Sequence, residues 1–256
     1  MTTPQPGGYD ADTYFAQAME RARAGESDSA AELLQKGSDR GHGPSAFLLG
    51  AWFKDAGRLG EAEVQYRRAL SSQGLSTEMV AASELSLGYI RARTGDDAGA
   101  EQYYRSAERH GNPDATFNLA NVLNRTGRAA EAEAAYRRAV LAGHPDAAFN
   151  LADILVERGE AEAAEPLLRQ AAVGGITDAY NALAKIRLGF DDVAGAENLL
   201  RTAVAAGDDD AVFNLGIVLL VRGALDEAEH WLRQAQAAGH PEASQYLEQI
   251  RTTRMS

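Results

Sequence analysis

The sequence contains no cysteine, so it can form no disulfide and has no thiol for catalysis or metal binding. This absence fits a reducing compartment, and we expect a cytoplasmic protein. No apolar run approaches the roughly 20 residues that a membrane helix needs. The opening residues, MTTPQPGGYD, lack the basic and apolar regions of a signal peptide. We therefore expect neither a membrane span nor secretion.

Proline and positive charge are also scarce. The chain has only seven prolines, and alanine and leucine dominate over short β-branched runs, which predicts an all-α fold. The formal net charge is −12, and a nucleic-acid partner is not expected because binding phosphates needs a basic surface. Residues 145–240 hold 16 acidic and 7 basic residues, whereas residues 43–144 hold 12 of each. Solubility explains this surplus, and the alternative is a basic partner surface that docks towards the C-terminal half.

A unit of 32 residues repeats along almost the whole chain. The copy from Pro145 reads PDAAFNLADILVERGEAEAAEPLLRQAAVGGI. Copies begin at or near Ala11, Gly43, Ala81, Pro113, Pro145, Thr177 and Asp209, and a partial copy begins at Pro241. Repeats of this length stack into solenoids in which each unit touches only its neighbours. The pattern predicts one solenoid domain over residues 11–251, a disordered tail over residues 1–10 and frayed residues 252–256.

The pattern within each unit predicts two helices, over positions 1–14 and about 17–30. A glycine at position 15 marks the turn, because it tolerates the left-handed conformation that ends a helix. The sixth repeat has Asp191 there and its glycine at Gly189, so we expect that turn to differ. Small residues at positions 8 and 20 let the two backbones approach, while leucine at position 7 and leucine or tyrosine at position 24 fill the core.

Two further features of the unit carry expectations. In six repeats, glutamate at position 21 stands four residues before arginine at position 25, which we interpret as solvated support for the second helix. Six extra residues precede the third repeat, and we expect its first helix to start early, with Ser76 as the N-cap.

The residues at positions 7, 8, 20 and 24, together with alanine at position 27, resemble the tetratricopeptide repeat. The linker AGHPDA resembles its Sel-one-like relatives. The resemblance covers residues 11–250. It implies a right-handed α-solenoid superhelix of about seven helix-turn-helix repeats plus a C-terminal capping helix that ends near Arg251.

No feature of the sequence indicates an enzyme. It has no nucleophile motif, phosphate-binding loop or dinucleotide fingerprint, and we expect no cofactor. Three of the five histidines share a Gly-His linker context and lie about three repeats apart, so we interpret them as structural and expect no metal site. Aspartates at helix starts are explained by the helix dipole.

The resemblance implies a binding groove along the first helices, on the concave face of the superhelix. The candidate residues at positions 5, 6 and 9 are Phe117, Phe149, Phe213, Asn118, Asn150, Asn214, Asn121, Asp153 and Lys185. Each amide can donate to and accept from an extended peptide, and the phenylalanines can receive apolar side chains. The alternatives stay open: the phenylalanines can be core, and the asparagines can satisfy backbone groups.

These patterns predict a non-catalytic protein–protein interaction scaffold that binds a peptide segment in its concave groove. Acidic residues on the same face favour a neutral polar or basic ligand. The alternative is a structural or self-assembly module that forms homo-oligomers through the solenoid ends or the convex face.

Overall fold

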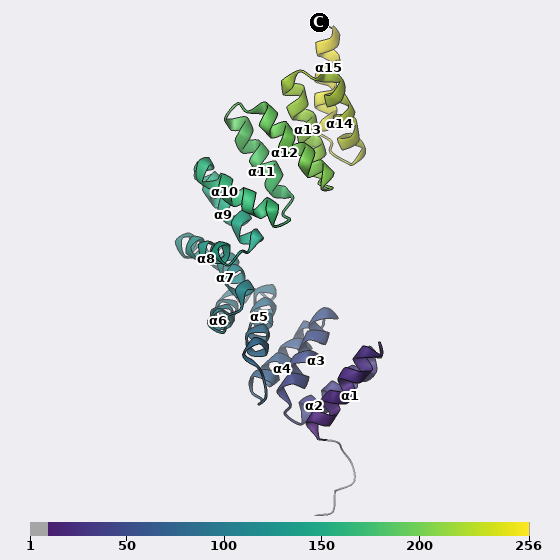
Figure 1. Ribbon diagram of the computed structural model, residues 1–256, viewed down its shortest axis with the longest axis vertical. Coiled ribbons are helices and arrows are strands. Elements are labelled where there is room, and N and C mark those ends of the chain that lie inside the picture. Colours follow the sequence, from purple (N-terminus) through teal and green to yellow (C-terminus); the bar gives the residue numbers. More distant parts are fainter. Residues whose placement is uncertain (1–9, 256) are drawn as a thin grey trace, which may run out of the picture. The chain divides into compact units, whose positions relative to one another are not determined.

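The computed structural model describes residues 10–255, which form fifteen α-helices and no strand (Figure 1). The predicted all-α fold is therefore confirmed. The predicted disordered tail lies, except for Asp10, outside the described residues. Within the described part of the chain, no helix combines the length and the apolar character that a membrane crossing requires.

The helices follow the repeat boundaries within a few residues. In chain order they are α1 (Ala11–Arg23), α2 (Ser27–Asp39), α3 (Gly43–Asp55), α4 (Leu59–Leu70), α5 (Thr77–Arg93), α6 (Asp97–Arg109), α7 (Pro113–Arg125), α8 (Ala129–Leu141), α9 (Pro145–Glu157), α10 (Ala161–Val173), α11 (Asp178–Gly189), α12 (Val193–Ala205), α13 (Asp209–Arg222), α14 (Leu225–Ala237) and α15 (Ala243–Met255). They fall into two compact units, Met1–Arg138 (unit 1) and Ala139–Ser256 (unit 2), divided inside α8. A single domain over residues 11–251, its handedness and its number of repeats remain predictions.

The two helices of each hairpin approach closely where position 8 meets position 24. A Cβ atom added at Gly88 of α5 would lie 2.5 Å from the ring of Tyr104 on α6. In unit 2, a Cβ at Gly216 of α13 would lie 2.7 Å from Leu232 of α14. The alanines at position 20 are buried in all seven repeats. The predicted hairpin crossing is thus confirmed, and bulky position 24 explains why position 8 stays small.

The turn between the helices has the same backbone in the sixth repeat as in the others. Asp191 adopts the left-handed conformation itself, with a φ of 57°, while Gly189 is the last residue of α11. The Asp191 N–H donates to Leu188 O at 3.1 Å, as the Gly159 N–H donates to Val156 O at 2.9 Å in the fifth repeat. The expectation of a different turn is wrong, because aspartate is among the few non-glycine residues that visit this region.

The extra residues and the chain end also extend helices. Ser76 caps α5, accepting a hydrogen bond from Met79 N–H at 3.2 Å, as predicted. The last helix, α15, continues to Met255 and does not end at Arg251. Arg254 explains the extension, because it pairs with Asp226 and Glu229 of α14.

Glutamate at position 21 links successive repeats. All six predicted pairs with arginine at position 25 form, but the glutamates are not solvated; the Glu197 side chain is only 8% exposed. Five of them also pair with an arginine of the next repeat: Glu63 with Arg91, Glu101 with Arg128, Glu165 with Arg187, Glu197 with Arg222 and Glu229 with Arg254. We call this series the Glu–Arg ladder.

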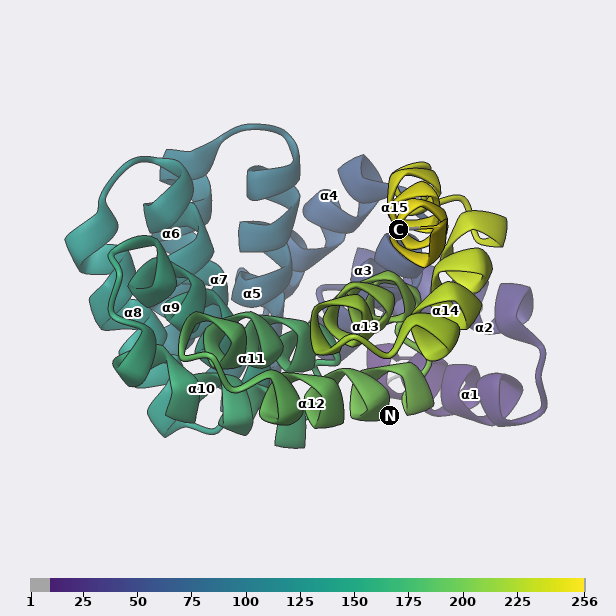
Figure 2. The same cartoon turned by 90° about the horizontal axis from the view of Figure 1, so that it is seen from above.

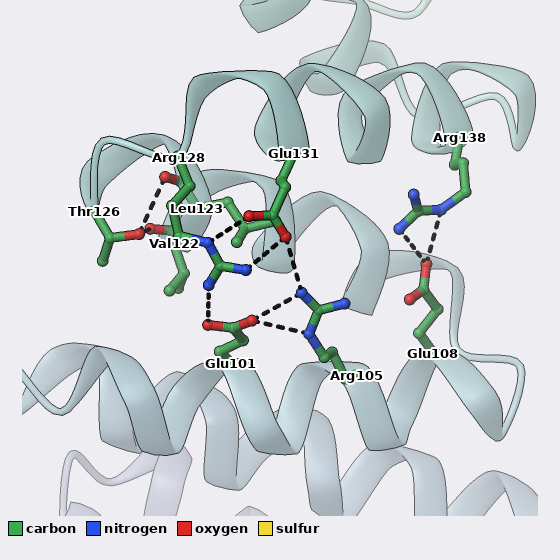
Figure 3. A network of polar contacts seen from close by, with 9 residues as sticks. All are labelled: Glu101, Arg105, Glu108, Val122, Leu123, Thr126, Arg128, Glu131 and Arg138. Atoms are coloured by element: carbon green, nitrogen blue, oxygen red, sulfur yellow. Dashed lines mark hydrogen bonds and ion pairs between the residues drawn. The ribbon is translucent and has the colours of Figure 1, made fainter.

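Figure 3 shows one rung of the ladder, in which Glu101 lies between Arg105 of its own helix and Arg128 of the following repeat. The Arg128 Nη1 atom donates to Glu101 Oε2 at 2.6 Å. Burial opposes ionisation of Glu101, but hydrogen bonds from both arginines outweigh it and hold its pKa below the usual value. The glutamate therefore joins two repeats as a carboxylate.

We predict that Gly88→Ala lowers the free energy of unfolding by about 1–3 kcal/mol, because the new methyl group overlaps the Tyr104 ring. Adding Tyr104→Leu should recover part of this loss. Alanine and leucine occupy the same two positions in the fifth and sixth repeats, so the pair is compatible with the hairpin. Urea denaturation of the wild type, the two single variants and the double variant measures the coupling free energy between the two positions. Strictly additive losses would show that the two positions do not touch.

Candidate functional site

The candidate site is a cavity of about 320 Å³ on the first-helix side of unit 2. Figure 2 shows α11 and α13 in one layer of this unit, with α12 and α14 in the other. The cavity, which we call the α11–α13 pocket, is lined by Asn181, Ala182, Ala184, Lys185, Leu188, Leu200, Asn214, Ile217 and Val218. Aliphatic side chains make up most of the wall, and two amides and one ammonium group supply its polar atoms.

The pocket arises where the sixth repeat departs from its neighbours. Positions 5 and 6 are Phe-Asn in repeats four, five and seven, but Asn181 and Ala182 in the sixth. A ring is replaced by an amide, and an amide by a methyl group, so less side-chain volume faces α13. The resulting space is large enough to take a side chain or a small ligand.

The two amides of the pocket are oriented by a buried carboxylate. Asn181 Nδ2 donates to Asp208 Oδ2 at 2.6 Å, and Asn181 Oδ1 accepts from Asn214 Nδ2 at 3.0 Å. Asp208 is only 9% exposed and caps α13 by accepting from Ala211 N–H at 3.0 Å. Among the described residues no donor reaches Asn214 Oδ1, so this carbonyl oxygen stays available as an acceptor at the pocket.

Three exposed acidic residues of α9 and α11 interact electrostatically at Asp153. Asp153 and Glu157 belong to α9, and Asp178 is the first residue of α11. Desolvation raises the pKa of Asp153, the nearby Glu157 and Asp178 raise it further, and Lys185 lowers it. In the part of the chain that the structure describes, none of these three carboxylates forms an ion pair. We call them the α9–α11 acidic seam.

The arginines of the same repeats are engaged elsewhere. Each pairs with an acidic residue that belongs to a second helix or is the N-cap of one. The pairs are Arg158 with Glu160, Arg169 and Arg187 with Glu165, Arg201 and Arg222 with Glu197, and Arg233 with Glu229. Within residues 145–240, Lys185 is the one cation that the described structure leaves outside an ion pair. None of these arginines therefore pairs with a carboxylate of the seam.

The predicted site residues do not form one cluster. Asn214 and Lys185 line the pocket, and Asp153 belongs to the acidic seam. Phe149 and Asn150 lie half-buried on α9, beyond the pocket lining.

The other predicted residues make intramolecular contacts. Phe213 stacks on His240, with ring centroids 5.4 Å apart, and Phe117 packs at 6.3 Å from Tyr136. In unit 1, Asn118 Nδ2 donates to Asp114 O at 2.8 Å, and Asn121 Oδ1 accepts from the Tyr136 hydroxyl at 2.6 Å. These contacts favour the packing alternative for Phe117 and Phe213, and they give Asn118 and Asn121 structural partners.

Sequence reasoning missed Ala182 and Leu188 as pocket-lining residues, whereas Asn181 and Ile217 fall at the predicted groove positions 5 and 9. The sequence signal for the pocket was the absence of the Phe-Asn pair from positions 5 and 6 of the sixth repeat. This signal is the loss of side chains and not the presence of a distinctive residue.

Two other cavities of unit 2 have different linings. One of about 390 Å³ between α14 and α15 is lined by ion-paired residues such as Arg254, Asp226 and Glu229. Another of about 460 Å³ lies among α10, α11 and α12 and includes Val173, Tyr180 and Leu199. Among residues 10–255, no group of three or more histidine, aspartate or glutamate side chains is arranged to hold a metal ion.

Known proteins share this fold. The tetratricopeptide repeat model matches residues 53–115, 108–143, 117–180 and 181–243. No curated protein matches the chain. A Sel1 repeat protein from Oxalobacter formigenes is 22% identical, with a TM-score of 0.61 over 80% of this chain and 89% of its own. A tetratricopeptide repeat protein from Parabacteroides merdae is 14% identical (TM-score 0.58; 97% and 100% covered), and pilF from Pseudomonas aeruginosa is 16% identical (0.65; 83% and 99%). These similarities confirm the α-solenoid fold.

We predict that Asn181→Ala lowers the free energy of unfolding by about 1–3 kcal/mol, because it removes a donor from the buried Asp208 carboxylate. Asn118→Ala is the matched control. It should cost less than about 0.5 kcal/mol, since that amide only donates to a carbonyl of its own helix near the surface. Thermal denaturation of both variants measures the difference. Equal losses would mean that the Asn181–Asp208 contact has no structural role.

Proposed function

Because the chain belongs to the tetratricopeptide repeat family, whose members generally mediate protein–protein interactions, we propose that it is a non-catalytic scaffold that binds a peptide segment. The segment lies across the first helices of unit 2 and inserts one apolar side chain into the α11–α13 pocket. The observation that carries this proposal is the pocket itself, an apolar cavity with oriented amides at predicted groove positions.

The chemistry of the pocket suits a peptide. Its aliphatic wall favours an apolar side chain, which is the usual anchor of a protein interface. Asn214 Oδ1 can accept a hydrogen bond from the peptide backbone, and the pocket amides are held in place by Asp208 before a ligand arrives. Such preorganisation reduces the entropy lost on binding.

We predict that Ala182→Leu weakens peptide binding at least about tenfold, because the added side chain fills the pocket. The fold should tolerate it, since three other repeats carry the larger asparagine at this position. The probes are fluorescein-labelled peptides selected by random-peptide display against the whole chain. Fluorescence anisotropy measures their affinity for the wild type, the variant and the control Ala163→Leu, which enlarges an exposed alanine of α10.

The control should bind as the wild type does. Unchanged affinity of a folded Ala182→Leu protein would contradict the pocket assignment. The double substitution Asn150→Ala and Asn214→Ala tests the predicted amides in the same assay. Weaker binding with an unchanged melting temperature supports their role in binding, whereas unfolding would make them structural.

Self-association through the second helices is a second candidate function. The cavity among α10, α11 and α12 measures about 460 Å³. Val173, which lines it, is 89% exposed. A second copy of this chain that inserts apolar side chains there would cover both features.

For this candidate, light scattering should show a mass that rises from monomer to dimer with concentration. Val173→Asp should keep the protein monomeric, because a carboxylate would be desolvated in the contact. The control is Val221→Asp, which alters an exposed valine of a different helix, α13. A monomer at every concentration would exclude self-association through this face.

A further inference from the structure

We propose that Asp208 sets the hydrogen-bonding direction of the α11–α13 pocket, so that the pocket selects a peptide with a backbone N–H beside its apolar anchor. This inference rests on the proposed function and specifies which group of the ligand the pocket recognises. It follows from a chain of three hydrogen-bonded side chains, Asp208, Asn181 and Asn214, and from a paired change of residues in the sixth repeat.

The direction of the chain is fixed at its buried end. Asp208 is only 9% exposed, and a carboxylate can only accept hydrogen bonds. Its Oδ1 accepts from Ala211 N–H at 3.0 Å, and its Oδ2 accepts from Asn181 Nδ2 at 2.6 Å. The nitrogen of the Asn181 amide therefore faces Asp208, and the oxygen of that amide faces the opposite way.

The second amide continues this direction into the pocket. Asn181 Oδ1 accepts from Asn214 Nδ2 at 3.0 Å, so the Asn214 amide has its nitrogen towards Asn181 and its oxygen away from it. Among the described residues, no hydrogen-bond donor contacts Asn214 Oδ1. The remaining polar side chain of the lining, Lys185, can only donate. Asn214 Oδ1 is thus the acceptor that the lining offers, and a backbone N–H of the peptide satisfies it.

The contact between Asn181 and Asp208 replaces a pair of rings. These two residues occupy positions 5 and 32 of the sixth repeat. In the seventh repeat the same positions hold Phe213 and His240, which stack with ring centroids 5.4 Å apart, and the corresponding rings of the first repeat are 5.0 Å apart. Both members of the pair are changed in the sixth repeat. The changed pair connects a buried acceptor to an amide of the pocket, which the stacked rings cannot do.

Asparagine in place of Asp208 should reverse the chain. Asparagine caps helices as well as aspartate does, so the oxygen of the new amide keeps the bond from Ala211 N–H and its nitrogen replaces Asp208 Oδ2. Asn181 then turns its oxygen towards that nitrogen and donates to Asn214. Asp208→Asn therefore keeps the cap, engages Asn214 Oδ1 within the protein and turns the Asn214 nitrogen towards the ligand.

The test starts from the fluorescein-labelled peptide that binds most tightly in the display selection against the whole chain. Alanine substitution along the peptide identifies its anchor as the apolar residue whose contribution is lost in Ala182→Leu. In matched peptides an ester replaces one backbone amide at a time, at the anchor and at the residues near it, which removes the N–H and changes the shape of the backbone little. Fluorescence anisotropy measures the ratio of the amide and ester affinities, which we call the ester penalty.

For the wild type, we expect one ester next to the anchor to weaken binding about tenfold, because it leaves Asn214 Oδ1 without a donor. In Asp208→Asn the penalty of this ester should disappear, and the unmodified peptide should bind about tenfold more weakly than it does to the wild type. Asn214→Ala should also remove the penalty, because it removes the acceptor.

Two further variants separate positioning from stability. Asp96→Asn is the matched control: it makes the same change at the N-cap of α6 in unit 1, where Asp96 accepts from Gly99 N–H at 2.9 Å, and it should keep the wild-type penalty. Asn181→Ala interrupts the chain, and the penalty should fall because Asn214 can then turn its oxygen to water. Circular dichroism melting confirms that each variant is folded. A purely structural role of Asp208 would weaken the amide and ester peptides equally.

Peptides that depend on Ala182 but show no ester penalty near the anchor would overturn this inference and leave the proposed function standing. A penalty that is unchanged in Asp208→Asn would overturn it as well, and so would an unchanged penalty in Asn181→Ala if the first variant does not fold. Peptides whose binding is unaffected by Ala182→Leu would instead overturn the proposed function, and this inference with it.

Discussion

The close contact between the two helices of each hairpin is the constraint on which the rest of the structure depends. Gly88 has no room for a methyl group against Tyr104, and Gly216 has none against Leu232. Because each hairpin buries one bulky residue at position 24 against one small residue at position 8, the spacing of its helices is nearly fixed. Fixed hairpins present the same edges to their neighbours, and one repeat can then stack on the next.

The Glu–Arg ladder adds direction to this stacking. Glu197 is 8% exposed and is shared by Arg201 of its own helix and Arg222 of the next repeat. A buried carboxylate with two arginines is satisfied only when both repeats are in register, and losing one partner leaves a desolvated charge. The ladder therefore favours one register over slipped alternatives, which apolar packing of similar repeats distinguishes poorly.

The sequence predicts the parts of this structure that depend on local patterns. The helix limits other than the end of α15, the Ser76 cap and the small residues at the crossings follow from the repeat and from backbone preferences. The burial of the ladder glutamates was not predictable in this way, because spacing within one helix does not show an arginine that arrives from the next repeat. The pocket was missed for a related reason. Asn214 and Lys185 were identified as candidates, but the cavity depends on the small side chain of Ala182, and a cavity has no sequence pattern of its own.

Stability and recognition are connected through the distribution of charge in unit 2. The ladder and the turns beside it engage the arginines from Arg158 to Arg233, and their acidic partners belong to the second helices or cap them. On the first helices, Arg187 and Arg222 pair with these second-helix acids, and among the described groups that act on Asp153 only Lys185 is a cation. Ion pairs that hold the repeats in register thus engage Arg187 and Arg222, which are then not paired with Asp153, Glu157 or Asp178. The six acidic and three basic residues of α9, α11 and α13 equal in number those of α10, α12 and α14, so ion pairing and not composition distinguishes the two sets of helices.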